Sequence, residues 1–92
     1  MVGMFAISMA GHDKGRMYLI IKEEGDTVYL ADGKTRTQEN PKKKKKKHLQ
    51  IMKKDVDQML MQKLMNKQTL YNEEIKYAIK IRANKEVMYV EG

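Results

Sequence analysis

The chain has 92 residues, no cysteine and a formal net charge of +7, so we expect one domain, or one small domain with an appendage, without disulfides or thiolate metal sites. No apolar run approaches the roughly 20 residues of a membrane-spanning helix, and the first residues lack the pattern of a secretory signal peptide. We therefore expect a cytoplasmic protein that is not inserted in a membrane.

The first part of the chain predicts strands. Apolar residues alternate with other residues on both sides of the segment 11–16, which is the period-two pattern of a half-buried strand. The predicted strands are Phe5–Met9, Met17–Glu23, Thr27–Ala31, a short edge strand Lys34–Thr37 and a closing strand Leu49–Ile51. Such closely spaced strands favour a small antiparallel barrel, because closure leaves no exposed sheet edge.

The segment Gly-His-Asp-Lys-Gly-Arg at positions 11–16 joins the first two predicted strands. Its glycines permit backbone angles that other residues avoid, and they let another chain approach closely. Lys14 and Arg16 place two cations at the tip, which favours contact with phosphates. Asp13 is unfavourable beside a phosphate, so we expect it to orient Lys14 or to cap the loop backbone. The alternative is an ordinary hairpin turn that needs two glycines.

Positive charge is concentrated in the middle of the chain. Residues 1–33 carry three Lys/Arg and five Asp/Glu, residues 34–54 carry ten and one, and residues 55–92 carry six of each. The central segment includes six consecutive lysines, Lys42–Lys47, between Pro41 and His48. Adjacent cations repel one another, so this run predicts a mobile loop. Two interpretations stay open: a solvated loop without a specific partner, or a cation chain that becomes ordered on nucleic-acid phosphates.

Two short helices are predicted after the strands. Asp55 is a predicted cap for the first helix, and Glu73 and Glu74 suit the first turn of the second, where the helix dipole favours anions. Apolar residues follow at helical spacing in both segments. We thus expect a barrel over residues 1–52 that includes the lysine-rich loop 41–48, a helical hairpin over 53–83 and a loose C-terminus over 84–92.

The Gly-x-x-Lys-Gly loop resembles the KOW motif of ribosomal proteins and transcription elongation factors. The segments Ala31–Arg36, Asn40–Lys44 and Lys47–Leu49 follow in an order that resembles a family of short bacterial KOW-domain RNA-binding proteins. That family is similar to KOW-containing proteins of the large ribosomal subunit. The segment Thr69–Ile79 is similar to the family's two-helix tail, so the resemblance extends over roughly residues 3–82.

The resemblance implies an SH3-like barrel followed by a two-helix tail, a fold that is mostly β with C-terminal helices. It also implies binding of structured RNA, with ribosomal RNA and ribosomal proteins as expected partners. His12 stands where many members of the family have Arg, which weakens one expected phosphate contact. The residues that the resemblance places at the RNA are Gly11, His12, Asp13, Lys14, Gly15, Arg16, Lys34, Arg36, Lys42, Lys43, Lys44, Lys45, Lys46, Lys47 and His48.

The sequence shows no catalytic arrangement, since no cysteine is present and no hydroxyl nucleophile has a partnered base. His12 and His48 have no acidic cluster at metal-ligand spacing. We therefore expect a protein that is not an enzyme and that takes no metal, cofactor or small-molecule substrate. The open alternative is a protein-interaction module that uses the barrel and the apolar helical hairpin to bind a transcription or ribosome-assembly partner.

Overall fold

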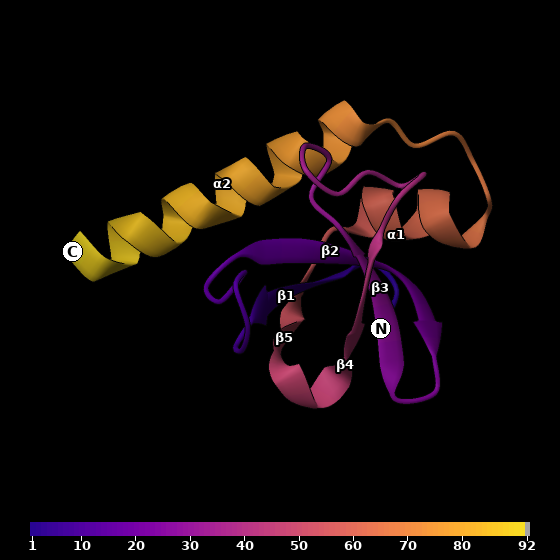
Figure 1. Ribbon diagram of the computed structural model, residues 1–92. Coiled ribbons are helices and arrows are strands. Elements are labelled where there is room, and N and C mark those ends of the chain that lie inside the picture. Colours follow the sequence, from indigo (N-terminus) through magenta and orange to yellow (C-terminus); the bar gives the residue numbers. More distant parts are fainter. Residues whose placement is uncertain (92) are drawn as a thin grey trace.

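The computed structural model describes the backbone of residues 1–91 and the side chains of residues 1–83. In chain order the elements are β1 (Met4–Ser8), β2 (Met17–Glu24), β3 (Thr27–Ala31), β4 (Lys42–Lys45), a 3-10 turn η1 (Lys46–His48), β5 (Leu49–Val56), α1 (Gln58–Met65) and α2 (Asn72–Glu91). The predicted class, mostly β with C-terminal helices, is confirmed (Figure 1).

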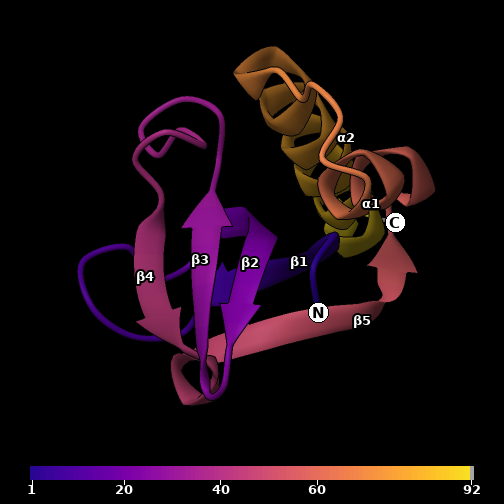
Figure 2. The same cartoon turned by 90° about the vertical axis from the view of Figure 1, so that its right-hand side faces the viewer.

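The five strands form one antiparallel sheet in the order β4-β3-β2-β1-β5. β4 and β5 are its two edges, and η1 connects them. Figure 2 shows β5 running at a steep angle to β3 and β4. The sheet is not closed, so the structure confirms an antiparallel sheet of five strands but not the predicted barrel.

The fourth strand does not lie where the sequence predicted it. The predicted edge strand Lys34–Thr37 is wrong, because these residues belong to the loop between β3 and β4. The Asp32 carboxylate accepts hydrogen bonds from the backbone N–H groups of Lys34 and Arg36, both at 2.8 Å, and from the Thr35 hydroxyl at 2.6 Å. A short carboxylate that satisfies successive backbone donors favours a tight loop over a strand. The fourth strand is instead formed by lysines of the run.

Apolar side chains lie on both faces of the sheet, as strand alternation dictates. On the first face, residues of β1, β2 and β3 pack against both helices. This cluster consists of Phe5, Leu19, Ala31, Leu60, Leu70, Ile75 and Ala78. The cluster on the second face consists of Ala6, Tyr18, Ile20, Val28 and Leu30. The helical tail is therefore packed on the sheet, and it covers only the first face (Figure 1).

The first helix begins later than predicted. β5 continues to Val56, beyond the predicted domain boundary at residue 52. Asp57, not Asp55, caps α1, and its carboxylate accepts a hydrogen bond from the Leu60 N–H at 3.1 Å. Asp55 instead forms an ion pair with Arg82 of α2 at 3.0 Å. An aspartate two residues nearer the helix thus takes the role predicted for Asp55.

α2 begins directly against the loop that follows β3. A Cβ atom added to Gly33 would lie 2.2 Å from the Asn72 carbonyl oxygen and 2.9 Å from the Lys76 nitrogen, so a residue with a side chain does not fit. The Gln38 N–H also donates to the Asn72 side chain at 3.1 Å. The helix backbone continues to Glu91, so the second helix is longer than predicted and includes most of the segment 84–92 that was expected to be loose. Gly92 lies outside the described residues.

Candidate nucleic-acid interface

The loop between β1 and β2 contains the KOW-like segment and is closed by backbone hydrogen bonds. The Ser8 N–H donates to the Arg16 carbonyl at 2.9 Å, and the Gly15 N–H donates to the Ser8 carbonyl at 2.8 Å. Gly11 and Gly15 have φ angles of 86° and 92°, a region that favours glycine. The two glycines are therefore required by the loop itself, and the loop leaves His12, Lys14 and Arg16 exposed.

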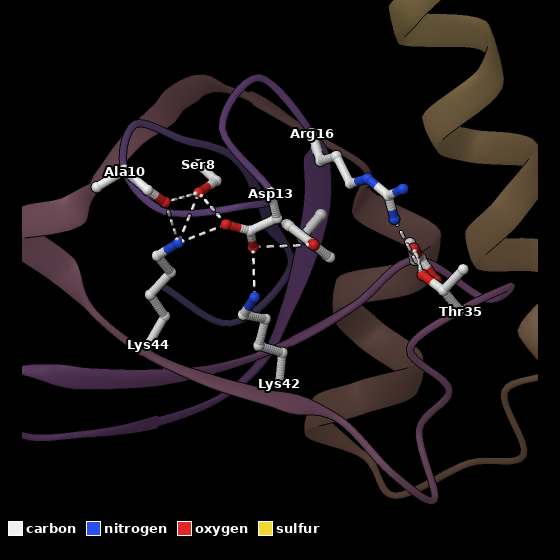
Figure 3. A network of polar contacts seen from close by, with 9 residues as sticks. Ser8, Ala10, Asp13, Arg16, Thr35, Lys42 and Lys44 are labelled. Carbon is white, nitrogen blue, oxygen red and sulfur yellow. Dashed lines mark hydrogen bonds and ion pairs between the residues drawn. The ribbon is translucent and has the colours of Figure 1, made fainter.

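Asp13 points inward from this loop and is the centre of a polar network (Figure 3). Its carboxylate accepts hydrogen bonds from the Ser8 hydroxyl at 2.8 Å and the Tyr18 hydroxyl at 3.0 Å. The Nζ atoms of Lys42 and Lys44 lie 2.8 and 2.7 Å from its oxygens. The sequence predicted that Asp13 orients Lys14 or caps the loop backbone. The side chain does neither. It connects the loop to β4.

The network changes the pKa values of Asp13 and Tyr18, two of its buried members. Burial by itself raises the pKa of Asp13, but hydrogen bonds from Lys42, Lys44, Ser8 and Tyr18 outweigh burial and hold that pKa far below its usual range. Burial and the hydrogen bond to Asp13 raise the pKa of Tyr18 to about 12. Asp13 is therefore an anion at all physiological pH values, and Tyr18 remains a neutral donor.

The lysine run is not a mobile loop in this structure. Its first four members form β4 and pair with β3, with Lys42 opposite Leu30 and Lys44 opposite Val28. Opposite residues share a sheet face, so these two lysines point toward the buried second cluster. Lys43 is opposite Tyr29 and points to the other face, where its Nζ lies 5.8 Å from the ring centroid. The run therefore has an inward and an outward row.

The two rows differ in their partners within the described residues. The inward row is engaged with acidic groups: Lys42 and Lys44 with Asp13, and Lys46 with Glu23. Of the outward row, Lys43 and Lys47 form no ion pair among the described side chains, whereas Lys45 pairs with Asp26 at 3.3 Å at the exposed surface. The inward row is structural, and the outward row leaves positive charge at the surface.

A hollow forms where the β1–β2 loop meets the β3–β4 loop, and we call it the loop hollow. Its lining includes His12, Asp13, Arg16, Thr35, Arg36 and Lys42. Its volume of about 470 Å³ admits a phosphate group with several waters, each of which occupies about 30 Å³ in the liquid. The structure thus brings four predicted site residues together, although 30 positions separate the first from the last. They are His12, Arg16, Arg36 and Lys42.

A second hollow lies beside the first, between the β3–β4 loop and α2, and we call it the helix hollow. It shares Arg16 and Thr35 with the loop hollow, and its lining includes Lys34, Lys76, Ile79 and Lys80. The Arg16 guanidinium donates to the Thr35 hydroxyl at 3.5 Å (Figure 3), and these two residues line both hollows. The sequence analysis missed Lys76 and Lys80. Their i, i+4 spacing places both on one helix face, but the spacing does not show that this face lies beside the β3–β4 loop.

The remaining predicted residues do not meet at these hollows. Lys45 and His48 lie with Lys43 and Lys44 along a shallow depression beside Thr27, at the end of β4 next to η1. Within residues 1–83 no cluster of His, Asp and Glu side chains has the arrangement of a metal site. No helix in the part of the chain that the structure describes is long and apolar enough to cross a lipid bilayer.

No protein-family model matches this sequence, and no curated protein matches it either. The resemblance to KOW-domain proteins therefore stays a prediction that rests on the segments quoted above. What the chain itself provides is an ordered basic surface that extends from the β1–β2 loop to α2.

Proposed function

We propose that this chain binds the phosphate backbone of structured RNA, and that its partner is ribosomal RNA. The observation that carries the proposal is the meeting of two basic loops at the loop hollow, where Arg16 and Arg36 have no acidic partner among the described residues. The only carboxylate in that lining, Asp13, already has four donors. A cationic hollow without spare anions suits a phosphate.

The outward lysines extend the same surface charge. Lys43 and Lys47 add two exposed cations on the outer side of β4 and η1, and neither forms an ion pair with an acidic side chain in the described part of the chain. In an RNA complex each contacted phosphate releases counterions, so the binding is strongly dependent on salt. Recognition of this kind reads the shape of an A-form backbone more than its sequence.

The finer fold that belongs to this proposal is an SH3-like barrel. The strand order has β5 returning to pair with β1, and η1 connects the two edge strands. The buried second cluster would be the barrel interior, and the Asp13 network would close one end of it. Protection of the backbone amides of the two edge strands, β4 and β5, from hydrogen exchange tests this assignment. Rapid exchange along both edges would contradict it.

The test of RNA binding uses two variants that remove the same charge. Arg16→Ala/Arg36→Ala empties the loop hollow of two cations, and Lys53→Ala/Lys54→Ala removes two exposed lysines of β5 that line neither hollow. Titrating each protein into a ribosomal RNA fragment over a salt series gives the affinity and its salt slope. We expect the first variant to lower the slope by about two and the second to lower it by less than one. Equal slopes in the two variants, or no binding by the parent protein at low salt, would contradict the proposal.

A second candidate function is contact with a protein partner through the helical tail. Met59, Met65, Tyr71 and Tyr77 are each at least 60% exposed, and these side chains are on or beside the helices. An apolar contact of this kind keeps its affinity as salt is added, whereas phosphate contacts lose it. Sedimentation of a cell extract at low and high salt separates the two functions. Co-sedimentation with ribosomes that salt abolishes favours RNA, and co-sedimentation that salt leaves intact favours the protein contact.

A further inference from the structure

The helix hollow contains more positive charge than the described side chains around it neutralise. Arg16, Lys34, Lys76 and Lys80 contribute four cations to its lining, and none of the four forms an ion pair among residues 1–83. The one carboxylate in the lining belongs to Asp32. That carboxylate already accepts hydrogen bonds from two backbone N–H groups and the Thr35 hydroxyl, and burial opposes but does not prevent the lowering of its pKa.

The position of the two helix lysines is fixed by packing. The Lys76 backbone lies against Gly33, next to Lys34, so the helix cannot move away from the loop without losing this contact. Ile75 and Ala78 are buried against the sheet and anchor the opposite face of this helical segment. Lys76 and Lys80 are therefore held on the rim of the hollow, where two like charges at i, i+4 spacing repel each other. A bound anion removes that repulsion.

The two hollows adjoin each other, because Arg16 and Thr35 line both. A single phosphate in the loop hollow leaves Lys34, Lys76 and Lys80 without a ligand. A strand with several phosphates would occupy both hollows, and the Arg16 guanidinium, which lines both, would lie between successive phosphates. A single ligand that occupies both hollows at once is thus a polyphosphate backbone that crosses from the β1–β2 loop to α2, and not an isolated anion.

We propose that α2 is a second RNA-contacting element, in which Lys76 and Lys80 bind the phosphates that follow those held by the loop hollow. This proposal rests on the proposed function, since it assigns additional contacts to the same RNA. It predicts that the affinity depends on how far the RNA strand extends beyond the loop hollow. It also predicts that the helix contributes binding free energy through its polar face, while its apolar face holds it on the sheet.

The test compares Lys76→Ala/Lys80→Ala with the charge-matched control Lys53→Ala/Lys54→Ala. Alanine is the best helix former, so the first variant keeps α2, which circular dichroism checks. Fluorescence anisotropy with ribosomal RNA oligonucleotides of increasing length provides the readout. We expect the parent and the control to gain affinity as the strand lengthens, while the α2 variant loses most of that gain. On the longest RNA we expect the α2 variant to bind about tenfold more weakly, with a salt slope lower by about two.

The outcomes separate the two proposals. If Arg16→Ala/Arg36→Ala weakens binding but the α2 variant behaves like the control at every RNA length, the α2 contact is overturned and the proposed function stands. If the parent protein does not bind these RNAs at low salt, both proposals fail. The variant Lys76→Arg/Lys80→Arg keeps the charge and is expected to retain the gain with length. Loss of the gain in that variant would overturn a phosphate role for these two lysines.

Discussion

The lysines on the two sides of β4 have different roles, although the residues are identical. On the inner side Lys44 donates to the Ser8 hydroxyl, the Ala10 carbonyl and Asp13, at 2.6 to 2.8 Å. On the outer side the Lys43 Nζ lies over the Tyr29 ring, 5.8 Å from its centroid, and the side chain is exposed. Successive side chains of a strand point to opposite faces, so a run of identical residues is divided between the two faces. In β4 the lysines on one face form internal contacts, and those on the other face remain at the surface. Exposed lysines on an edge strand also discourage pairing with another chain.

Removing the acidic partner of the inner row is expected to have the largest effect. Asp13→Asn keeps the shape of the side chain but leaves Lys44, whose side chain is only 10% exposed, without its counterion. We expect a loss of about 3–5 kcal/mol in the free energy of unfolding, measured by urea denaturation. The control Asp26→Asn breaks the exposed pair with Lys45 and is expected to leave the free energy of unfolding nearly unchanged. Similar losses in both variants would contradict a structural role for the network.

The two rows are compared directly by making the same change in each. Lys44→Met removes three internal hydrogen bonds, although Lys42 still pairs with Asp13. We expect it to destabilise the protein by about 1–3 kcal/mol. Lys43→Met is expected to change stability by less than about 0.5 kcal/mol while lowering RNA affinity. A reversal of this pattern in thermal denaturation and RNA titration would refute the division into two rows.

The Tyr18 hydroxyl provides a smaller test of the inner side. Tyr18→Phe preserves the packing of the ring in the second cluster and removes one donor to Asp13. Three other donors to that carboxylate remain, so we expect a loss of about 1 kcal/mol in unfolding free energy. Tyr29→Phe is the matched control on the outer side, because the Tyr29 ring is only partly buried. Its expected loss of stability is smaller, and a larger one would show that the outer side is also structural.

Lowering the pH is expected to have the smallest effect on stability, and it acts on the ion pair between Glu23 and Lys46, the last lysine of the inward row. Hydrogen bonds from Lys46 and from the N-terminal amine lower the pKa of Glu23 from its ordinary value of 4.5 to about 2. A carboxyl whose pKa is lowered by folding stabilises the fold above its unfolded pKa, and this contribution is lost as pH falls through the folded pKa. The parent protein is thus expected to be more stable than Glu23→Gln above pH 4.5, and the difference shrinks between pH 4.5 and 2. A constant difference in denaturation midpoint across this range would show that the pair contributes nothing.

The elements with a clear period were predicted correctly. The strands that became β1, β2 and β3 lie within one residue of their predicted bounds, because their apolar residues alternate in the chain itself. The fourth strand was misplaced for a physical reason. Lys34–Thr37 has strand-like alternation, but Asp32 satisfies the backbone donors that a strand would use. The uniform lysine run has no alternation to detect, and its strand is imposed by pairing with β3.

The candidate site was predicted in part. Arg16 and Arg36 were predicted site residues, and the structure brings them together at the loop hollow. Lys76 and Lys80 were missed, because the sequence near them does not show which face of α2 lies against the β3–β4 loop, which precedes them by about forty residues. Whether these groups hold RNA stays a prediction, and the variants above decide it.

The order of residues alone determined the alternating strands, the two required glycines of the β1–β2 loop and the concentration of charge in the middle of the chain. These properties depend on backbone geometry and on residues close in sequence, so they are readable without a fold. The tertiary structure decided that Asp13 neutralises the inner lysines and that α2 lies beside Arg16. Both depend on contacts between segments far apart in the chain, and the same contacts determine which of the many cations remain available to a partner.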